Sequence, residues 1–450
     1  MSFSFLTLFN YLKMAKVVQF EEIHAKAAGI DIGSRGVFVS IDGEQVVNFK
    51  TFTSDYQLCC KYLKDNGIVS TAIEATGVYW MTLYEMLEEH GIEVCLVHPT
   101  ETQQVPGRKS DPKDSRWIQK IYSAGLLRES IVAKGELKEL RMLTRERLDL
   151  IQMGSTYINK MQKHLELMNI KLRNVISQIH GASGLRIIKA IISGERDPEE
   201  LLALCHGTIK SKKREDVLKS LQGNYHPTYI ALLKENQYLY EQHQLCIERI
   251  EIQIQELLDK LNRDNKQIEV TSPARPARHH NPAIADLHTK MVQMYGGVNL
   301  TTIAGINDST MLRLLGEIGN DLSRFPSKKH FVSWVGLSPK NKQSGKMKKR
   351  VKCNSSNNAG LIFRQSAQSL FNSKNNAIGV FMKRLKGRKG AKVAVKAGAR
   401  KIAEAFYDAI TKGLDYVEQG IAKYIEQMRQ KELKLMNILA NRYNYVCVEN

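Results

Sequence analysis

Short apolar runs and amphipathic stretches alternate along the first quarter of the chain. Five runs have the length and composition of strands: residues 27–32, 37–41, 45–52, 69–75 and 92–99. The first two flank a glycine-bounded turn and predict a hairpin. The last two alternate with helical patterns, the third of which starts near Asp111. A meander followed by alternating strands and helices predicts a mixed-sheet α/β domain.

Beyond residue 136 the apolar spacing changes to that of helices. Ile151, Ile158, Leu165 and Leu172 recur every seven residues, with Met161 and Met168 between them and Gly154 as an interruption. This heptad pattern predicts a coiled coil that joins subunits. A second helical run, at 227–261, repeats the spacing at Leu232, Leu239, Cys246, Ile250 and Leu257. Short helices are expected between the two runs.

The remainder of the chain is predicted to be mostly helical. A proline-rich stretch at 271–283 indicates a linker. A helix–turn–helix hairpin is expected at 301–319, followed by an apolar helix, a basic loop, a second basic loop and a long helix. The predicted organisation is a leader without packed structure at 1–26, an α/β domain at 27–135, a coiled coil with inserted helices at 136–270, a linker at 271–299, a C-terminal domain at 300–415 and a helical tail at 416–450.

Charge is concentrated in one segment. The formal net charge is +20, and residues 323–403 contain 21 Lys and Arg but no Asp or Glu. Such a segment predicts contact with a polyanion, most simply a nucleic acid. The candidate contacts are Lys342, Lys346, Lys348, Lys349, Arg350, Lys386, Arg388 and Lys389.

The seven cysteines lack the spacing of zinc sites and are expected to be reduced thiols in a cytosolic protein. No apolar run approaches the ~20 residues of a membrane span, so no membrane partner is expected.

Four acids stand out from the rest. Asp31 and Glu74 interrupt strand-like runs, and Asp111 and Asp114 lie one helical turn apart at a helix start. Separately they have simple explanations: a turn residue, a strand-end charge and a capping pair. Together, four carboxylates at one sheet edge are best explained by a hard divalent cation, Mg²⁺ (or Mn²⁺). Two such ions ~4 Å apart would clamp the oxygens of a phosphodiester.

Four motifs resemble one enzyme family: GIDIGSRGVFVSIDG, IEATGVYW, VHPTETQQVPGRKSDPKDSRWI and the block from IAGINDST to GLSPKNKQSG. They are similar to the DEDD transposases of insertion-sequence family 110, over residues 27–172 and 300–413. The resemblance implies an RNase H/RuvC-like domain that carries the four acids, a coiled coil for assembly and a C-terminal domain with a nucleophilic serine. The matching serine is Ser344, and Arg364 occupies the family's arginine position.

The resemblance also implies the activity and the partners. Ser344 would attack a DNA phosphodiester, with metal held by Asp31, Glu74, Asp111 and Asp114. The expected partners are donor and target DNA, a structured bridge RNA that guides both, and further copies of the chain in a dimer or tetramer. The expected location is the prokaryotic cytoplasm, at the nucleoid.

Three other functions compete with a recombinase. A RuvC-like junction-resolving endonuclease would use the same acids with water as nucleophile. An actin-like ATPase would explain the DIGSRG turn, but the sequence has no second phosphate loop. A non-catalytic nucleic-acid scaffold would leave acids in strand interiors unexplained.

Overall fold

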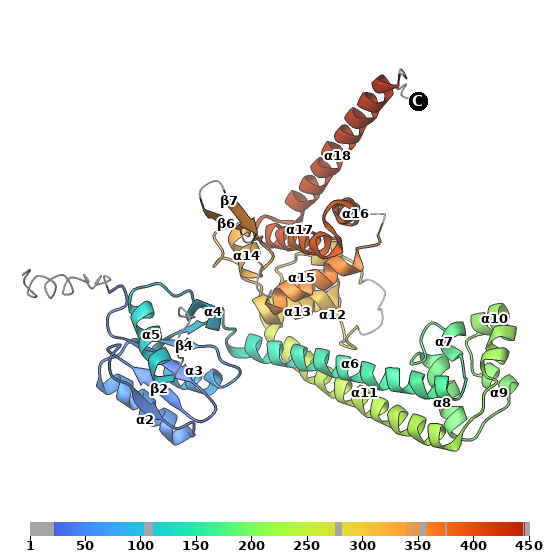
Figure 1. Ribbon diagram of the computed structural model, residues 1–450, viewed down its shortest axis with the longest axis horizontal. Coiled ribbons are helices and arrows are strands. Elements are labelled where there is room, and N and C mark those ends of the chain that lie inside the picture. The colour runs from blue at the N-terminus through green and yellow to red at the C-terminus, as the bar shows by residue number, and fades with distance from the viewer. Residues whose placement is uncertain are drawn as a thin grey trace, which may run out of the picture. The chain divides into compact units, whose positions relative to one another are not determined.

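The computed structural model describes residues 22–102, 111–274, 281–339, 341–344, 347–350, 357–373, 376–443 and 445, without side chains at 111–112, 341–344, 347–350, 416–425 and 428. The chain divides into two compact units, Met1–Val132 and Ala133–Asn450 (Figure 1).

The first unit contains a five-stranded mixed sheet. Its strands are β1 (Ala27–Ile32), β2 (Val37–Ser40), β3 (Val47–Phe49), β4 (Ser70–Glu74) and β5 (Glu93–Val97), in the order β3-β2-β1-β4-β5. β1, β2 and β3 pair antiparallel, whereas β4 pairs parallel with both β1 and β5. The mixed α/β domain predicted from the sequence is therefore confirmed.

Alternate residues of the strands face opposite layers of helix. Ala28, Ile30 and Ile32 point to the side of α2 (Thr53–Asp65) and α3 (Trp80–Glu89) and share a core with Leu63 and Leu83. On the other face, Ala27 and Ala72 pack against Ile118 and Tyr122 of α5 (Asp111–Ser123). A short helix, α4 (Pro99–Thr102), follows β5. Because β1 is covered on both faces, its residues other than Asp31 are apolar or glycine, and β4 buries Ser70 and Thr71 together with its apolar residues.

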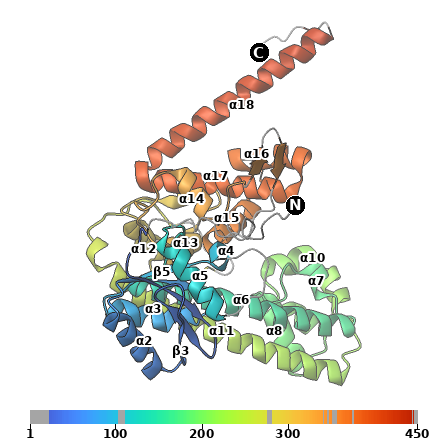
Figure 2. The same cartoon turned by 60° about the vertical axis from the view of Figure 1, so that its left-hand side comes forward.

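Two long helices form an antiparallel pair in the second unit (Figures 1 and 2): α6 (Gly135–Leu167) and α11 (Pro227–Leu261). Arg147 is bonded to Glu251, and His164 contacts Asn236, so residue numbers fall along one helix as they rise along the other. Along α6, a series of buried residues has intervals of three, four or seven: Leu140, Thr144, Arg147, Gly154, Met161 and Leu165.

The expected subunit seam is largely occupied within the chain. Leu165 is buried, and Ile158 packs against the same intramolecular cluster, which includes Leu233 and Tyr240 of α11. The first positions of the second heptad were placed one residue too early, because Leu232 and Leu239 are 42% and 38% exposed whereas Leu233 and Tyr240 are buried. The reason is that α11 carries apolar residues on two adjacent columns. The last position of this heptad series, Leu257, is buried as expected.

Four short helices cap the far end of this pair: α7 (Leu172–Val175), α8 (Ala182–Ile192), α9 (Pro198–Ala203) and α10 (Gly207–Ser220). Ile187, Ile188 and Ile191 of α8 join Met161 and Leu165 in one apolar core. The inserted residues therefore form a small bundle closed by the end of the α6–α11 pair.

Part of the expected linker is folded. After the 3-10 turn η1 (Arg263–Asn265), α12 (Leu287–Met294) buries Met291 and Val292, and it also buries His288. His288 Nδ1 lies 2.7 Å from Asp308 Oδ1, and its Nε2 lies 3.1 Å from Ser272 Oγ. These contacts hold the segment before α12 to the helix that follows.

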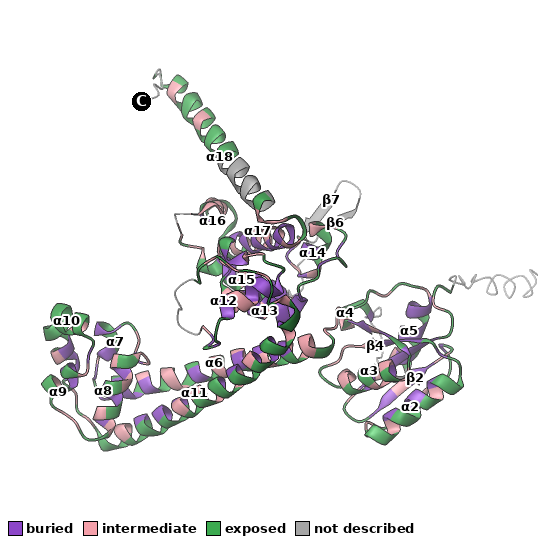
Figure 3. Ribbon diagram, turned by 180° about the vertical axis from the view of Figure 1, so that it is seen from behind, coloured by how far each residue is buried: buried purple, intermediate pink, exposed green. Residues whose placement is uncertain are grey.

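The C-terminal helices surround an aromatic core. They are α13 (Asp308–Ile318), α14 (Lys328–Trp334), α15 (Asn358–Ser369), α16 (Ala377–Lys389), α17 (Ala391–Lys412) and α18 (Leu414–Arg442). Phe331, Phe363 and Phe406 are fully buried against one another. Figure 3 shows this purple core at α13, α15 and α17, in contrast to the green of α18.

Three local predictions in this region are wrong. The first helix of the expected hairpin is a single 3-10 turn, η2 (Leu300–Thr302), ahead of α13. The first basic loop contains a β-hairpin of β6 (Asn341–Ser344) and β7 (Met347–Arg350), and the second is helix α16. Dense positive charge had suggested solvated loops, but lysine and arginine are good helix formers.

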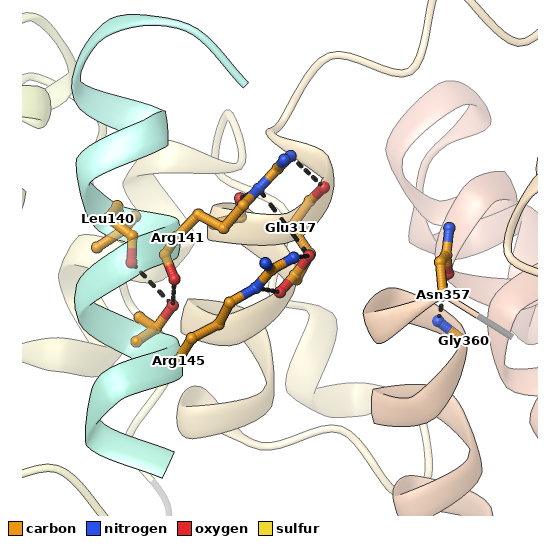
Figure 4. Close-up of polar contacts among 8 residues, drawn as sticks. Leu140, Arg141, Arg145, Glu317, Asn357 and Gly360 are labelled. Carbon is orange, nitrogen blue, oxygen red and sulfur yellow. Dashed lines mark hydrogen bonds and ion pairs between the residues drawn. The ribbon is translucent and has the colours of Figure 1, made fainter. Parts of the chain in front are cut away.

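A buried acid joins the long helix α6 to the C-terminal helices (Figure 4). Glu317 of α13 accepts two hydrogen bonds from Arg145 of α6, at 2.7 and 2.8 Å. Arg141 donates to the carbonyl oxygens of Gly316 and Glu317, at 2.9 Å each. The bidentate geometry fixes α13 on α6.

Candidate active site

The placement of α5 on the sheet determines the geometry of the site. A Cβ atom on Gly29 would lie 2.2 Å from the backbone nitrogen of Gln119 and 2.4 Å from the carbonyl oxygen of Ser115. Only glycine permits this approach of helix to strand. Gln119 Nε2 contacts the carbonyl oxygen of Ala27, and Ile23 bonds to the carbonyl oxygen of Ser123. α5 therefore runs antiparallel to β1, with its first turn toward the end of β1.

Asp31 and Glu74 lie side by side at this end of the sheet. Ile30 is paired with Ile73 in parallel register, so the next residues along the two strands are neighbours. Asp31 has the same parity as Gly29, and Glu74 the same parity as Ala72, so both belong to the face that α5 covers. Both residues are half-buried. Two carboxylates on adjacent strands would repel each other unless a positive charge lay close.

The helical pair of acids begins α5. Asp111 is its first residue, and Asp114 is half-buried one turn later. The antiparallel course of α5 brings this turn to the strand ends that carry Asp31 and Glu74. The side chain of Asp111 lies outside the described part of the structure.

Glu74 is oriented by a residue that the sequence analysis did not identify. The buried hydroxyl of Thr102, at the end of α4, donates a short hydrogen bond to Glu74 Oε2. Thr76 Oγ1 lies 3.4 Å from Glu74 Oε1. Trp117 of α5 donates from Nε1 to the carbonyl oxygen of Thr102 at 3.0 Å, which ties α4 to α5. No sequence motif signals Thr102, because its role depends on how α4 packs.

The donor set suits a hard divalent ion. Carboxylate oxygens are the ligands that Mg²⁺ and Mn²⁺ prefer, and a threonine hydroxyl that orients one of them is a usual supporting contact. Among the side chains that the structure describes, a set from which Asp111 is missing, no three acidic, histidine or cysteine residues form a metal-binding cluster.

Ser344 is the last residue of β6. It pairs with Met347 of β7, and the connection is Gly345 and Lys346, which are outside the described residues. Lys342 pairs with Lys349, and Asn341 pairs with Arg350. Lys348 pairs with Gln343 in the same ladder. The backbone thus places the serine at the tip of a hairpin whose strands carry four basic residues.

The other basic candidates lie on helices. Lys386, Arg388 and Lys389 are exposed at the end of α16, where the helix dipole favours positive charge. Lys386 Nζ also lies 5.0 Å from the centre of the Phe371 ring. Arg364 of α15 is half-buried, and its Nε has no hydrogen-bond partner among the described residues.

Two further sequence expectations concern the whole chain. Five cysteines fall within the described residues and are free thiols: Cys59, Cys60, Cys95, Cys205 and Cys246. In the same part of the chain no helix is both long and apolar enough to cross a membrane.

Comparison with known proteins identifies the enzyme class. Residues 28–170 match the DEDD domain of IS110 transposases, and residues 298–378 match the domain described as Transposase IS116/IS110/IS902 family. The first match contains all four acids, and the second contains Ser344. Comparison with curated proteins gives no match.

Both matches define the chain as a DNA transposase, an enzyme that recombines the DNA of an insertion sequence. More narrowly, the chain belongs to the IS110 family of transposases. A DEDD domain works with divalent metal ions, and its substrate is DNA.

Proposed function

We propose that the first unit is a RuvC-like metal site that acts with Ser344 to cut and rejoin DNA. The observation that carries this proposal is the placement of Asp31 and Glu74 on adjacent parallel strands, beneath the helix that begins with Asp111 and Asp114. The β3-β2-β1-β4-β5 order, with one antiparallel and one parallel half, also supports a RuvC-like fold.

The four carboxylates would hold Mg²⁺ or Mn²⁺. The bound ion would supply positive charge that favours an ionised hydroxyl and stabilises the leaving oxygen. Asp31 and Glu74 provide ligands from rigid strands, and Thr102 fixes the orientation of Glu74. Asp111 and Asp114 complete the set from the first turn of α5.

Ser344 is the proposed nucleophile. Its Oγ attacks the phosphorus and forms a phosphoserine bond, the bond from phosphorus to the leaving sugar oxygen breaks, and the serine proton passes to solvent or to that oxygen. Attack by the new DNA end reverses the step and releases the serine. Lys342, Lys346, Lys348, Lys349 and Arg350 belong to the hairpin and would offset the charge of the transition state.

The positive charge of the C-terminal domain suits a nucleic acid that the protein contacts through the sugar–phosphate backbone. Residues 323–403 contain no acid, and Lys386, Arg388, Lys389 and Arg364 extend the positive charge beyond the hairpin. We propose that a structured guide RNA selects donor and target DNA by base pairing, so that the protein contacts mainly phosphates. The active form is a homo-oligomer, dimer or tetramer, in the prokaryotic cytoplasm.

The nucleophile can be tested by trapping a covalent adduct. The protein is incubated with its RNA, labelled donor and target DNA and Mg²⁺, and the products are separated under denaturing conditions. We expect a protein–DNA adduct with the native chain and with Ser333→Ala, a control at an exposed serine of α14. We expect none with Ser344→Ala.

The same experiment distinguishes a recombinase that uses serine as nucleophile from an endonuclease that uses water. If Ser344→Ala still cleaves DNA, water is the nucleophile and the enzyme is a junction-resolving endonuclease. Replacing Asp31 or Glu74 by Ala should abolish cleavage while RNA binding remains. Cleavage that survives in both acid variants would contradict the metal site.

A further inference from the structure

The last long helix, α18 (Leu414–Arg442), has the sequence of a coiled-coil strand. Apolar residues follow one another at intervals of three and four, with Lys431 as the one polar position in the series. The series is Leu414, Val417, Ile421, Tyr424, Met428, Lys431, Leu435 and Ile438. A single lysine in such a seam lowers stability but restricts the register of the partner helix.

The described half of this seam is exposed. Leu435 is 57% exposed and Ile438 63%, and the adjacent Met436 and Leu439 are also open to solvent (Figure 3). Ile254 and Leu258, at equivalent positions of the α6–α11 pair, are fully buried. Exposed apolar residues in a continuous stripe indicate a surface that another chain covers. α18 contacts α17, and its Glu432 pairs with Arg384 of α16. Leu435 and Ile438 remain exposed beside this pair.

The charge of the tail argues against nucleic acid as the occupant. Residues 414–450 contain five basic and five acidic residues, whereas residues 323–403 contain 21 basic residues and no acid. A neutral helix with an apolar stripe suits a protein surface rather than a polyanion.

The charges are also divided between the two halves of the helix. Residues 414–427 carry Asp415, Glu418 and Glu426 against one lysine, and residues 428–443 carry four basic residues against Glu432. An antiparallel pair of α18 helices places the acidic half of each beside the basic half of the other. The helix is therefore complementary to a second copy of itself.

We infer that α18 pairs antiparallel with α18 of a second copy of this chain and forms a coiled coil between subunits. The α6 seam is largely occupied within the chain, and α18 carries a further heptad series whose described apolar residues Leu435 and Ile438 are exposed. The inference names a contact for the oligomer proposed above and rests on that part of the proposed function. It does not depend on Ser344 or on the four acids.

The mass of the full chain in solution tests this contact. Light scattering is measured after nuclease treatment and removal of nucleic acid, with circular dichroism as the check on folding. We expect at least a dimer for the native chain and a lower mass for Leu435→Glu/Ile438→Glu. The dissociation constant should rise by about 100-fold or more, because the added charges would enter an apolar seam. The matched control, Gln430→Glu/Asn437→Glu, adds the same charge outside the seam and should keep the native mass.

A charge exchange tests the antiparallel direction. Lys431→Glu/Lys434→Glu leaves both halves acidic and should weaken the oligomer. Adding Asp415→Lys/Glu418→Lys to this variant restores opposite charges in the two halves and should restore the mass. Failure of that rescue would overturn the antiparallel arrangement.

A native chain that is monomeric at micromolar concentration, or a folded Leu435→Glu/Ile438→Glu variant with native mass, would overturn the inference. Either result would leave the adduct experiment on Ser344 unaffected, so the two proposals fail separately. A third result would also contradict self-association. If the native chain is a monomer bound to a different protein, and Leu435→Glu/Ile438→Glu releases that protein, the stripe binds that protein instead.

Discussion

Glu74 depends on a hydroxyl group that lies 28 residues further along the chain. Thr102 is buried at the end of α4, and its side chain donates to the carboxylate, while Trp117 holds its carbonyl oxygen. Such a contact limits the rotation of a ligand before a cation arrives. The pattern of acids predicts which residues bind metal, but it carries no information on which neutral residue orients them.

Removing the Thr102 hydroxyl tests this positioning role. Thr102→Val keeps the shape of the side chain but leaves Glu74 without its donor. We expect cleavage at limiting Mg²⁺ to fall by about 10- to 100-fold, with recovery at high Mg²⁺ concentration. Thr102→Ser should behave like the native enzyme, as should Thr100→Val, because Thr100 contacts His98 instead. An unchanged Mg²⁺ dependence in Thr102→Val would rule out the role.

Cys60, which is buried, and Cys95, which is half-buried, give a test of the first unit at high pH. Burial raises the pKa of the Cys60 thiol from an ordinary value of 9.0 to about 11, and that of Cys95 to about 12. Because folding keeps these thiols protonated, their contribution to stability is complete below pH 9 and is lost as the pH rises through 11 to 12.

We therefore expect iodoacetamide at pH 8 to leave Cys60 and Cys95 unmodified in the native protein, as read by mass spectrometry. The same treatment in denaturant should modify both, and native modification of Cys60 would show that the sheet opens readily.

Among the elements, α6 and α11 show how a polar pair sets the register of two antiparallel helices. Arg147 and Glu251 are both buried at a bond length of 2.7 Å, and the second oxygen of Glu251 accepts from the backbone nitrogen of Ala283 at 2.9 Å. The carboxylate thus links both long helices to the segment before α12. Burying the Glu251 carboxylate costs free energy, and the bonds from Arg147 and Ala283 offset this cost. Both bonds form in only one alignment of α6 with α11.

Replacing one residue of this pair should lower the free energy of unfolding more than replacing both. Arg147→Met strands a buried carboxylate and should lower the free energy of unfolding by about 3–5 kcal/mol. Arg147→Met/Glu251→Leu should recover most of that loss. Denaturant unfolding of the two single variants and the double variant gives the coupling. Additive effects would show that the ion pair contributes nothing to the helix pairing.

For the whole molecule, the division into two units separates the four acids from Ser344 along the chain. The acids belong to the unit that ends at Val132, and the serine belongs to the unit that begins at Ala133. An active site built from two such units can be completed within one chain or by a second copy. Completion by a second copy would restrict cleavage to the assembled enzyme.

Mixing two inactive variants distinguishes these arrangements. Ser344→Ala lacks the proposed nucleophile and Asp111→Ala lacks a proposed metal ligand, so each alone should be inactive. We expect the mixture to regain cleavage, since a mixed oligomer contains one site with both groups. A mixture of Ser344→Ala with Ser344→Ala/Asp111→Ala serves as the control and should stay inactive. If the first mixture also stays inactive, each site is built within one chain.

Local pattern was sufficient for the strands of the first unit, and it singled out four acids whose binding of metal stays a prediction. Strand periodicity and glycine-bounded turns act over a few residues, and an acid within an apolar strand is visible without any knowledge of packing. The same holds for the basic segment 323–403, because charge depends on composition alone.

Packing determined the rest. The partner of the α6 seam, the helix within the expected linker, the hairpin that carries Ser344 and the role of Thr102 all depend on contacts between residues far apart in the chain. A heptad series or a basic run can pack against several partners. The partner is decided in the folded protein, where one column of side chains is buried and the neighbouring column stays exposed.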